Sequence, residues 1–188
     1  GSNYIIKTTN KSTLISLIII TIIGAVIRLF YYSLPLTYDE AYTYLNFIDE
    51  GFTELFHYKL PNNHQFYTIC AKIAINILGD HQAVLRLPSL LFGLSNILLI
   101  FLVVKYISPK SSGLFACFML SCMPIIIYYD TLARGYTILS TFSLLLLLLS
   151  FKFIKTKSIN SLIFIIIISS LGFLTIPTFA FPLIGTLF

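Results

Sequence analysis

Five stretches of this chain contain no charged side chain, and most of them are about as long as a bilayer is thick. They cover residues 12–27, 87–104, 111–129, 135–151 and 158–188. A helix needs about 20 apolar residues to cross the hydrocarbon core. Charged residues make up only 10% of the chain and its mean hydropathy is +0.93, whereas a soluble domain carries about a quarter charged residues. The unbroken apolar runs also lack the alternation of a transmembrane barrel. We therefore predict an all-α fold, a polytopic bundle of transmembrane helices.

One further apolar stretch, residues 65–79, is too short and too polar to be read as a span, because it is about 15 residues long and contains Lys72 and Asn76. Its apolar residues fall on one helical face and its polar residues on the other, which predicts a helix over 63–79 lying in the membrane interface. A similar helix is expected over 38–51, with Ala41, Leu45 and Ile48 in its apolar stripe. We call these two helices the juxtamembrane helices.

The charges then predict a topology. The expected spans are 12–33, 84–106, 112–129, 135–154 and 158–176, with a sixth beginning near 178. This arrangement puts all seven acidic residues on one face and a set of lysines on the other: Lys7, Lys11, Lys105, Lys110, Lys152, Lys155 and Lys157. The positive-inside rule assigns the lysine face to the cytoplasm. Because 158–188 ends within an apolar run, we expect 1–188 to be a single transmembrane domain and the N-terminal part of a longer module.

Two adjacent carboxylates, Asp39 and Glu40, follow the first apolar run. Charges beside a membrane span are costly, and carboxylates can act as general bases. One interpretation is structural, with Thr37 and Glu40 forming a capping box and Asp39 favoured by the helix dipole. The other makes Asp39 a general base facing a pocket under the juxtamembrane helices, with Glu40 orienting it. Both carboxylates are catalytic candidates, and both interpretations stay open.

Asp130 and Arg134 lie in the short turn before the fourth predicted span. Being four residues apart, they could pair along one helix face. Alternatively, Arg134 faces a lipid phosphate at headgroup depth, since a guanidinium binds phosphate oxygens in a bidentate manner. Asp130 is thus a third catalytic candidate, and Arg134 a substrate-binding candidate.

Four other residues are candidates for substrate binding: His64, Lys59, Tyr42 and Tyr136. His64 could donate to a phosphate or a sugar hydroxyl, or simply lie at the interface. Lys59 could be a second phosphate contact or an ordinary interfacial lysine. The tyrosines could line a sugar pocket or belong to the aromatic belt at the membrane surface.

Other polar residues are given plainer interpretations. Arg86, which precedes the second span, is interpreted as an interfacial anchor. Cys117 and Cys122 share one span and are expected to be packing residues. No histidines or cysteines have the spacing of a metal site, so no metal-binding residue is assigned and the cofactors stay unknown.

The order of these elements resembles the GT-C glycosyltransferases, and among them the protein O-mannosyltransferase and aminoarabinose-transferase type. The resemblance covers about residues 12–140. The matching elements are Tyr38-Asp39-Glu40-Ala41, the segment from Asn62 to His64, Arg86-Leu87-Pro88-Ser89 followed by Gly93, and Ala133-Arg134-Gly135-Tyr136. One departure is Gln65-Phe66 after His64, where the family often has prolines.

The resemblance implies a polyprenyl-phosphate-linked sugar donor, an outer-face active site and an acidic base in the first outer loop. By this match Asp39 is the base, Asp130 the second acidic position and Arg134 the arginine beside it. The family also has two juxtamembrane helices in that loop.

We therefore expect an inverting glycosyltransferase that transfers a sugar to an acceptor hydroxyl on a protein, lipid or glycan. It would be an integral protein of a bacterial cytoplasmic membrane, with its site on the outer face and no nucleic-acid partner. The net charge of +5 reflects lysines at span ends rather than nucleic-acid binding. A transporter would place ionisable groups near the bilayer midplane, and a non-catalytic assembly subunit would not need the ordered acidic and arginine elements. These remain the alternative functions.

Overall fold

The computed structural model describes residues 10–49 and 63–187, and within these ranges the chain is helical and has no strand. The elements, in chain order, are α1 (Lys11–Tyr32), α2 (Tyr38–Thr43), the π-helical turn η1 (Tyr44–Ile48), α3 (Gln65–Leu78), α4 (Gln82–Ile107), α5 (Lys110–Cys122), α6 (Pro124–Asp130), α7 (Tyr136–Thr156), α8 (Ile159–Thr175), the 3-10 turn η3 (Pro177–Phe179) and α9 (Ala180–Leu187). The predicted all-α membrane bundle is confirmed.

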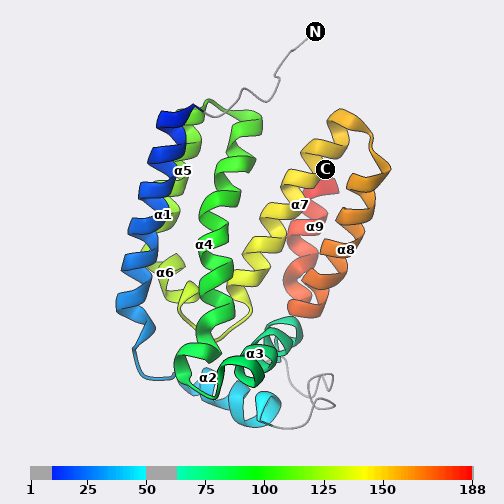
Figure 1. Cartoon of the computed structure of the whole chain (residues 1–188). Helices are drawn as coiled ribbons and strands as arrows, with labels where there is room; N and C mark the ends of the chain where they lie inside the picture. The colour runs from blue at the N-terminus through cyan, green and yellow to red at the C-terminus, as the bar shows by residue number, and fades with distance from the viewer. Residues whose placement is uncertain (1–9, 50–62, 188) are drawn as a thin grey trace.

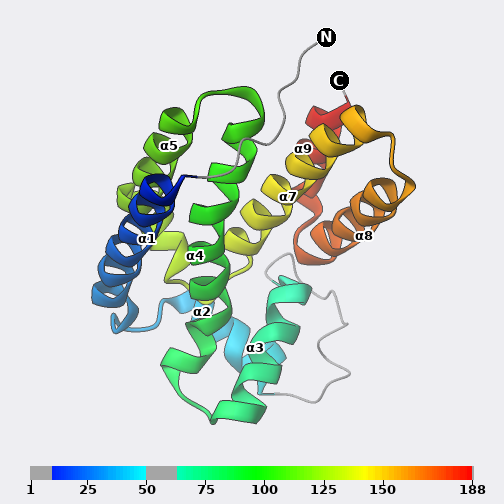
Figure 2. The ribbon, with the colours of Figure 1, turned by 45° about the horizontal axis from the view of Figure 1, so that its top comes forward.

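The long helices run side by side and form the body of the bundle (Figures 1 and 2). Among the described residues, α1, α4 and α7 are each long and apolar enough to cross a bilayer. The pair α5 and α6 would make a fourth crossing, bent by 66° where Pro124 opens α6. A proline cannot donate the backbone hydrogen bond that would continue α5, so the break falls there. α8, with 17 residues, is a shorter apolar helix.

The two ends of the bundle differ in charge. The α4–α5 and α7–α8 connections lie at the same end as the start of α1, whereas α2, α3 and the α6–α7 turn lie at the other (Figure 1). Lysines at the first end include Lys105 in the last turn of α4 and Lys155 in the last turn of α7. The Lys155 ammonium lies 4.7 Å from the ring centroid of Tyr106, so these two helix ends adjoin. We call this the lysine end, and the opposite one the acidic end, because α2 carries Asp39 and Glu40 there.

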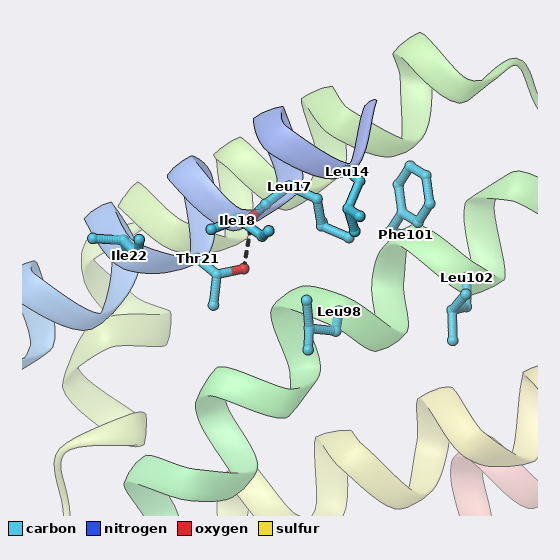
Figure 3. Close-up of a pocket in the computed structure, with 8 residues that line it drawn as sticks. All are labelled: Leu14, Leu17, Ile18, Thr21, Ile22, Leu98, Phe101 and Leu102. Atoms are coloured by element: carbon cyan, nitrogen blue, oxygen red, sulfur yellow. Dashed lines mark hydrogen bonds between the residues drawn. The ribbon is translucent and has the colours of Figure 1, made fainter. Parts of the chain in front are cut away.

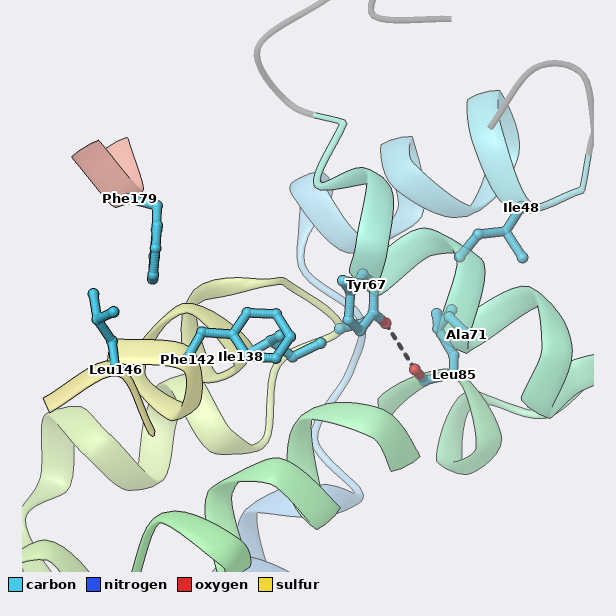
Figure 4. Close-up of a cluster of buried hydrophobic side chains, with 9 residues drawn as sticks. Ile48, Tyr67, Ala71, Leu85, Ile138, Phe142, Leu146 and Phe179 are labelled. Carbon is cyan, nitrogen blue, oxygen red and sulfur yellow. Dashed lines mark hydrogen bonds between the residues drawn. The ribbon is translucent and has the colours of Figure 1, made fainter. Parts of the chain in front are cut away.

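The main core lies where α3 meets α4 and α7 (Figure 4). Its buried members are Ile48, Tyr67, Ala71, Leu85, Ala133, Ile138, Phe142, Leu146 and Phe179. The Tyr67 hydroxyl donates a hydrogen bond of 2.7 Å to the Leu85 carbonyl, which fastens α3 to α4. A smaller cluster of Ile97, Phe101 and Cys117 joins α4 to α5, and the buried Cys117 thiol donates to the Ile97 carbonyl at 3.0 Å. Cys117 is therefore a packing residue, as predicted.

The juxtamembrane helices bury other faces than their apolar stripes suggest. In α3, Tyr67, Thr68 and Ala71 face the bundle, while Ile77 is 74% exposed on the apolar face expected to meet the interface. In the first helix, Leu45 and Ile48 were expected to share one apolar stripe, but Leu45 is 60% exposed whereas Ile48 is buried.

The π-helical turn explains the difference in the first helix. A π turn holds more residues than an α turn, so the residues that follow it change face. Phe47 and Ile48 both become buried as a result. Residues 38–51 were expected to form one α-helix, but the regular α-helix ends at Thr43 and η1 at Ile48.

Candidate active site

Asp39 and Glu40 are neighbours in sequence but face different surroundings. The Asp39 side chain is 58% exposed, whereas that of Glu40 is fully buried. The predicted capping box forms: the Glu40 amide donates to the Thr37 hydroxyl at 3.4 Å, and the Thr37 amide donates to Glu40 Oε2 at 2.8 Å. The box turns the Glu40 carboxylate back toward the helix start, and leaves the Asp39 carboxylate on the outside of the first turn.

The Glu40 carboxylate is held by Arg86 of α4 in a bidentate pair, with Nε 2.7 Å from Oε1 and Nη2 2.8 Å from Oε2. The Ala133 amide also donates to Oε1, at 2.7 Å. Burial by itself would raise the pKa of Glu40, but the hydrogen bonds from Arg86, Thr37 and Ala133 outweigh it and hold the pKa below its ordinary value. Glu40 therefore joins α2, α4 and the turn before α7.

The interpretation of Arg86 as an interfacial anchor is wrong. Its side chain is 1% exposed and lies inside the protein. Besides pairing with Glu40, its guanidinium donates to the carbonyl of Tyr32, the last residue of α1, and to those of Leu34 and Pro35 just after it. These carbonyls lie at a helix end, where they lack partners within the helix.

Asp130 is paired with Arg28 of α1, rather than with Arg134 as one interpretation of the sequence had it. Arg28 donates to Asp130 Oδ2 from Nε at 2.9 Å and from Nη2 at 2.6 Å, and both side chains are buried. Thr137 donates to the other oxygen, Oδ1, at 2.9 Å. Residues 131–135 form a turn, so positions 130 and 134 do not share a helix face. Gly93 makes room for the carboxylate, because a Cβ there would lie 2.4 Å from Asp130 Cγ.

Arg134 lies in this turn and faces α2. Its Nη1 donates to the Thr43 hydroxyl at 3.1 Å, and its Nη2 lies 3.9 Å from Asp39 Oδ2. The guanidinium carbon is 5.7 Å from the centroid of the Tyr136 ring. The Arg134 side chain is only 4% exposed, whereas the Asp39 carboxylate beside it is open to solvent. A carboxylate and a guanidinium from distant parts of the chain thus meet at the acidic end.

His64, which precedes α3, contacts the same turn. Its Nδ1 accepts a hydrogen bond of 2.8 Å from the Gly135 amide, and its ring lies edge-on to Tyr136 at 4.9 Å. A Cβ on Gly135 would come within 2.8 Å of the His64 Cβ, so the close approach requires glycine. Burial, followed by the charge of Arg134, lowers the pKa of His64 to about 3. His64 is therefore neutral near pH 7, and since Nδ1 is an acceptor its proton is on Nε2.

The two candidate tyrosines belong to separate aromatic groups. Tyr42 is partly buried between Tyr38, at 6.3 Å, and Phe47, at 6.2 Å. Tyr136 is 38% exposed and lies 5.1 Å from Tyr129. The candidate Lys59 lies outside the described residues. Among residues 10–49 and 63–187, no group of three or more histidine, cysteine or acidic side chains is arranged to hold a metal ion.

Two residues of this region were missed by sequence reasoning. Arg28 was given no role, although a charge in a span is rare and normally faces a partner inside the bundle. That rule could have marked Arg28 as a partner for an acidic residue. Thr43, the hydrogen-bond partner of Arg134, gives no comparable signal, because its role depends on a contact between distant segments.

Comparison with known families decides the class of the protein. The sequence model of the dolichyl-phosphate-mannose-protein mannosyltransferase family matches residues 66–188. The chain belongs to this family. It is therefore a membrane glycosyltransferase of the GT-C type, as the resemblance implied. No curated protein and no solved structure matches the chain. The family match includes Asp130, Arg134 and Tyr136, and begins after Asp39, Glu40 and His64.

Proposed function

We propose that this glycosyltransferase transfers a sugar from a polyprenyl-phosphate donor to an acceptor hydroxyl, with inversion at the anomeric carbon and Asp39 as the general base. The observation that carries the proposal is the meeting of Asp39 and Arg134 at the acidic end, 3.9 Å apart. Such a transfer needs a group that accepts a proton and a group that receives a departing phosphate, and these two side chains supply both.

The base assignment rests on the difference between the acidic residues. Both oxygens of Glu40 and both oxygens of Asp130 accept hydrogen bonds from buried donors. The Asp39 carboxylate is more than half exposed, and among the described residues the Arg134 guanidinium lies at the edge of ion-pair distance from it. A base must reach an incoming hydroxyl, which favours the accessible carboxylate.

In the proposed reaction, Asp39 takes the proton of the acceptor hydroxyl as its oxygen attacks the anomeric carbon. The bond from that carbon to the phosphate oxygen breaks, and the polyprenyl phosphate leaves with the negative charge. Arg134 meets this charge, because its guanidinium is a cation that can bind two phosphate oxygens. The buried position of Arg134 supports the assignment, since less solvent strengthens the interaction with a departing anion.

We assign the other candidates supporting roles. Glu40 and Asp130 are positioning residues, because they fix α2 and the turn that carries Arg134. His64, neutral and protonated on Nε2, is a hydrogen-bond donor to the phosphate or the sugar. Tyr42 and Tyr136 line the sugar pocket, and Lys59 is a second phosphate contact.

We further propose that the acidic end faces outward from a bacterial cytoplasmic membrane. Helix ends bearing Lys105, Lys110 and Lys155 are grouped at the opposite end, which the positive-inside rule assigns to the cytoplasm. Cysteines introduced at Asn76 and Lys105 test this orientation in intact cells. We expect a membrane-impermeant thiol reagent to label Asn76→Cys and to leave Lys105→Cys unmodified. Labelling of Lys105→Cys alone would reverse the orientation.

Transfer of radiolabelled mannose from polyprenyl phosphate, measured in proteoliposomes of the full-length protein, tests the mechanism. Mannose is the first choice because the family description includes it. We expect Asp39→Asn to lower the rate by roughly 10²–10⁴-fold, the usual contribution of a general base. Asp49→Asn, an exposed acid at the end of η1, is the matched control and should keep the wild-type rate. Full activity of Asp39→Asn would remove the base assignment.

A further inference from the structure

A groove with an apolar lining runs between α1 and α4, away from the candidate active site (Figure 3). It has a volume of about 500 Å³. Its main lining side chains are Leu14, Ile18 and Ile22 of α1 and Leu98, Phe101 and Leu102 of α4. Thr21 also lines it, but its hydroxyl donates to the Leu17 carbonyl at 2.8 Å within the same helix. The groove therefore suits a hydrocarbon chain.

Each wall of the groove ends in a lysine. On α1, Leu14 and Ile18 lie three and seven residues after Lys11, so Lys11 continues the lining face by one turn. On α4, Lys105 comes four residues after Phe101 and continues that face in the same way. Lys11 is the first residue of α1 and Lys105 lies in the last turn of α4, and both of these helix ends lie at the lysine end (Figure 1).

We propose that the groove binds an anionic phospholipid of the leaflet at the lysine end, with one acyl chain between α1 and α4 and its phosphate at Lys11 and Lys105. An acyl chain matches the apolar walls, and an anionic headgroup matches the two lysines. Leu14, Ile18 and Leu98 are between 43% and 50% exposed, so the chain replaces bilayer contact along the groove. A basic residue near a membrane surface contributes about 1 kcal/mol to attraction of anionic lipid.

This site is distinct from the proposed catalytic one. Asp39 and Arg134 lie at the acidic end, whereas the two lysines lie at the opposite end of α1 and α4. A lipid bound there is fastened along α1, whose far end carries Arg28 and its pair with Asp130. The lipid proposal does not depend on which sugar is transferred. Its test measures lipid binding rather than sugar transfer, so its failure can be told apart from the failure of the catalytic proposal.

Fluorescence quenching by brominated lipids tests the proposal, because the chain contains no tryptophan and an introduced one is a unique reporter. Leu98→Trp reports on the groove. Ile166→Trp, at an exposed apolar position of α8, reports on the general lipid surface. Each variant of the full chain is reconstituted in phosphatidylcholine bilayers containing increasing fractions of brominated phosphatidylglycerol or, separately, brominated phosphatidylcholine. Ile18→Trp provides a second reporter in the groove if Leu98→Trp does not fold.

We expect the groove reporter to be quenched by brominated phosphatidylglycerol at a fraction roughly 25-fold lower than by brominated phosphatidylcholine. The reporter on α8 should show no preference. Each lysine should account for roughly fivefold of the preference. Lys11→Gln with Lys105→Gln should abolish it, whereas Lys152→Gln with Lys157→Gln, at the same end but on α7 and its C-cap, should retain it.

Equal quenching of the groove reporter by both lipids would overturn the proposal, as would a preference that survives loss of Lys11 and Lys105. Weaker quenching by both lipids than at position 166 would also overturn it, since a protein segment or a second copy would then cover the groove.

Discussion

The adjacent residues Asp39 and Glu40 offer a direct experiment, because the structure gives them opposite surroundings. We expect Glu40→Gln to destabilise the fold and Asp39→Asn to leave its stability nearly unchanged. The rate of sugar transfer should fall more in Asp39→Asn than in Glu40→Gln. Removing the charge of Glu40 leaves Arg86 buried without a carboxylate. Asp39→Asn removes only a loose pair at 3.9 Å on an exposed side chain.

The expected magnitudes follow from burial. Removing one partner of a buried ion pair costs about 3–5 kcal/mol. Glutamine keeps an oxygen that can still accept from Arg86 or Ala133, so the lower end, about 3 kcal/mol, applies. In a protein of this size that corresponds to a fall in Tm of roughly 6–12 °C. An exposed pair contributes about 0–1 kcal/mol, so Asp39→Asn should shift Tm by no more than about 4 °C.

A thiol-reactive fluorophore provides the assay in detergent. Cys117 is completely buried and reacts only when the bundle opens, so Cys70→Ser and Cys122→Ser make it the single reporter of unfolding. A double-mutant cycle with Arg86→Met then measures the coupling with Glu40, which we expect to be about 1–3 kcal/mol. Additive effects of the two substitutions, or a wild-type Tm for Glu40→Gln, would refute the structural role of the pair.

Three further predictions concern the turn before α7 and its neighbours. The pKa of His64 is about 3 in the folded protein and near 6.5 when unfolded, so the unfolded state binds more protons between these values and stability should fall as the pH drops from 7 to 5, by about 2 kcal/mol. His64→Asn, measured by the same thermal assay, should remove most of this dependence. Gly135→Ala should cost about 1–3 kcal/mol, because the new Cβ would lie 2.8 Å from the His64 Cβ; an unchanged Tm would contradict the close contact. Gly93→Ala should cost a similar amount by displacing Asp130, whereas Gly185→Ala, with no atom within 4 Å of the new Cβ, serves as the neutral control.

The helical architecture could be predicted because hydrophobicity and charge act locally. The span expected over 12–33 corresponds to α1, at Lys11–Tyr32, and the one over 84–106 to α4, at Gln82–Ile107. The capping box of Thr37 and Glu40 could also be predicted, because it depends on two residues that are three positions apart in the sequence. The bend between α5 and α6 was not predicted, although Pro124 marks it in the sequence. The π-helical turn was not predicted either, because it depends on how the helices pack.

The ion pairs of the site could not be predicted from local patterns. Arg28 and Asp130 are 102 residues apart, and Glu40 and Arg86 are 46 apart. Either arginine could have been interpreted as an anchor at the membrane surface, because each lies near the end of a predicted span. Only the packing of α1, α4 and the turn before α7 determines which carboxylate each one meets.

The two buried pairs have a common consequence for the site. Arg86 and Glu40 fix α2, and the Ala133 amide joins the turn to the same carboxylate. Arg28 and Asp130 hold the start of that turn from the other side. Asp39 and Arg134 therefore project from a framework whose charges are already neutralised, and their mutual contact, at 3.9 Å, is the loosest of the three pairs. A donor phosphate can enter between a base and a cation only if they do not bind each other tightly. The strong pairs thus supply rigidity, and the weak pair leaves the space in which transfer is proposed to occur.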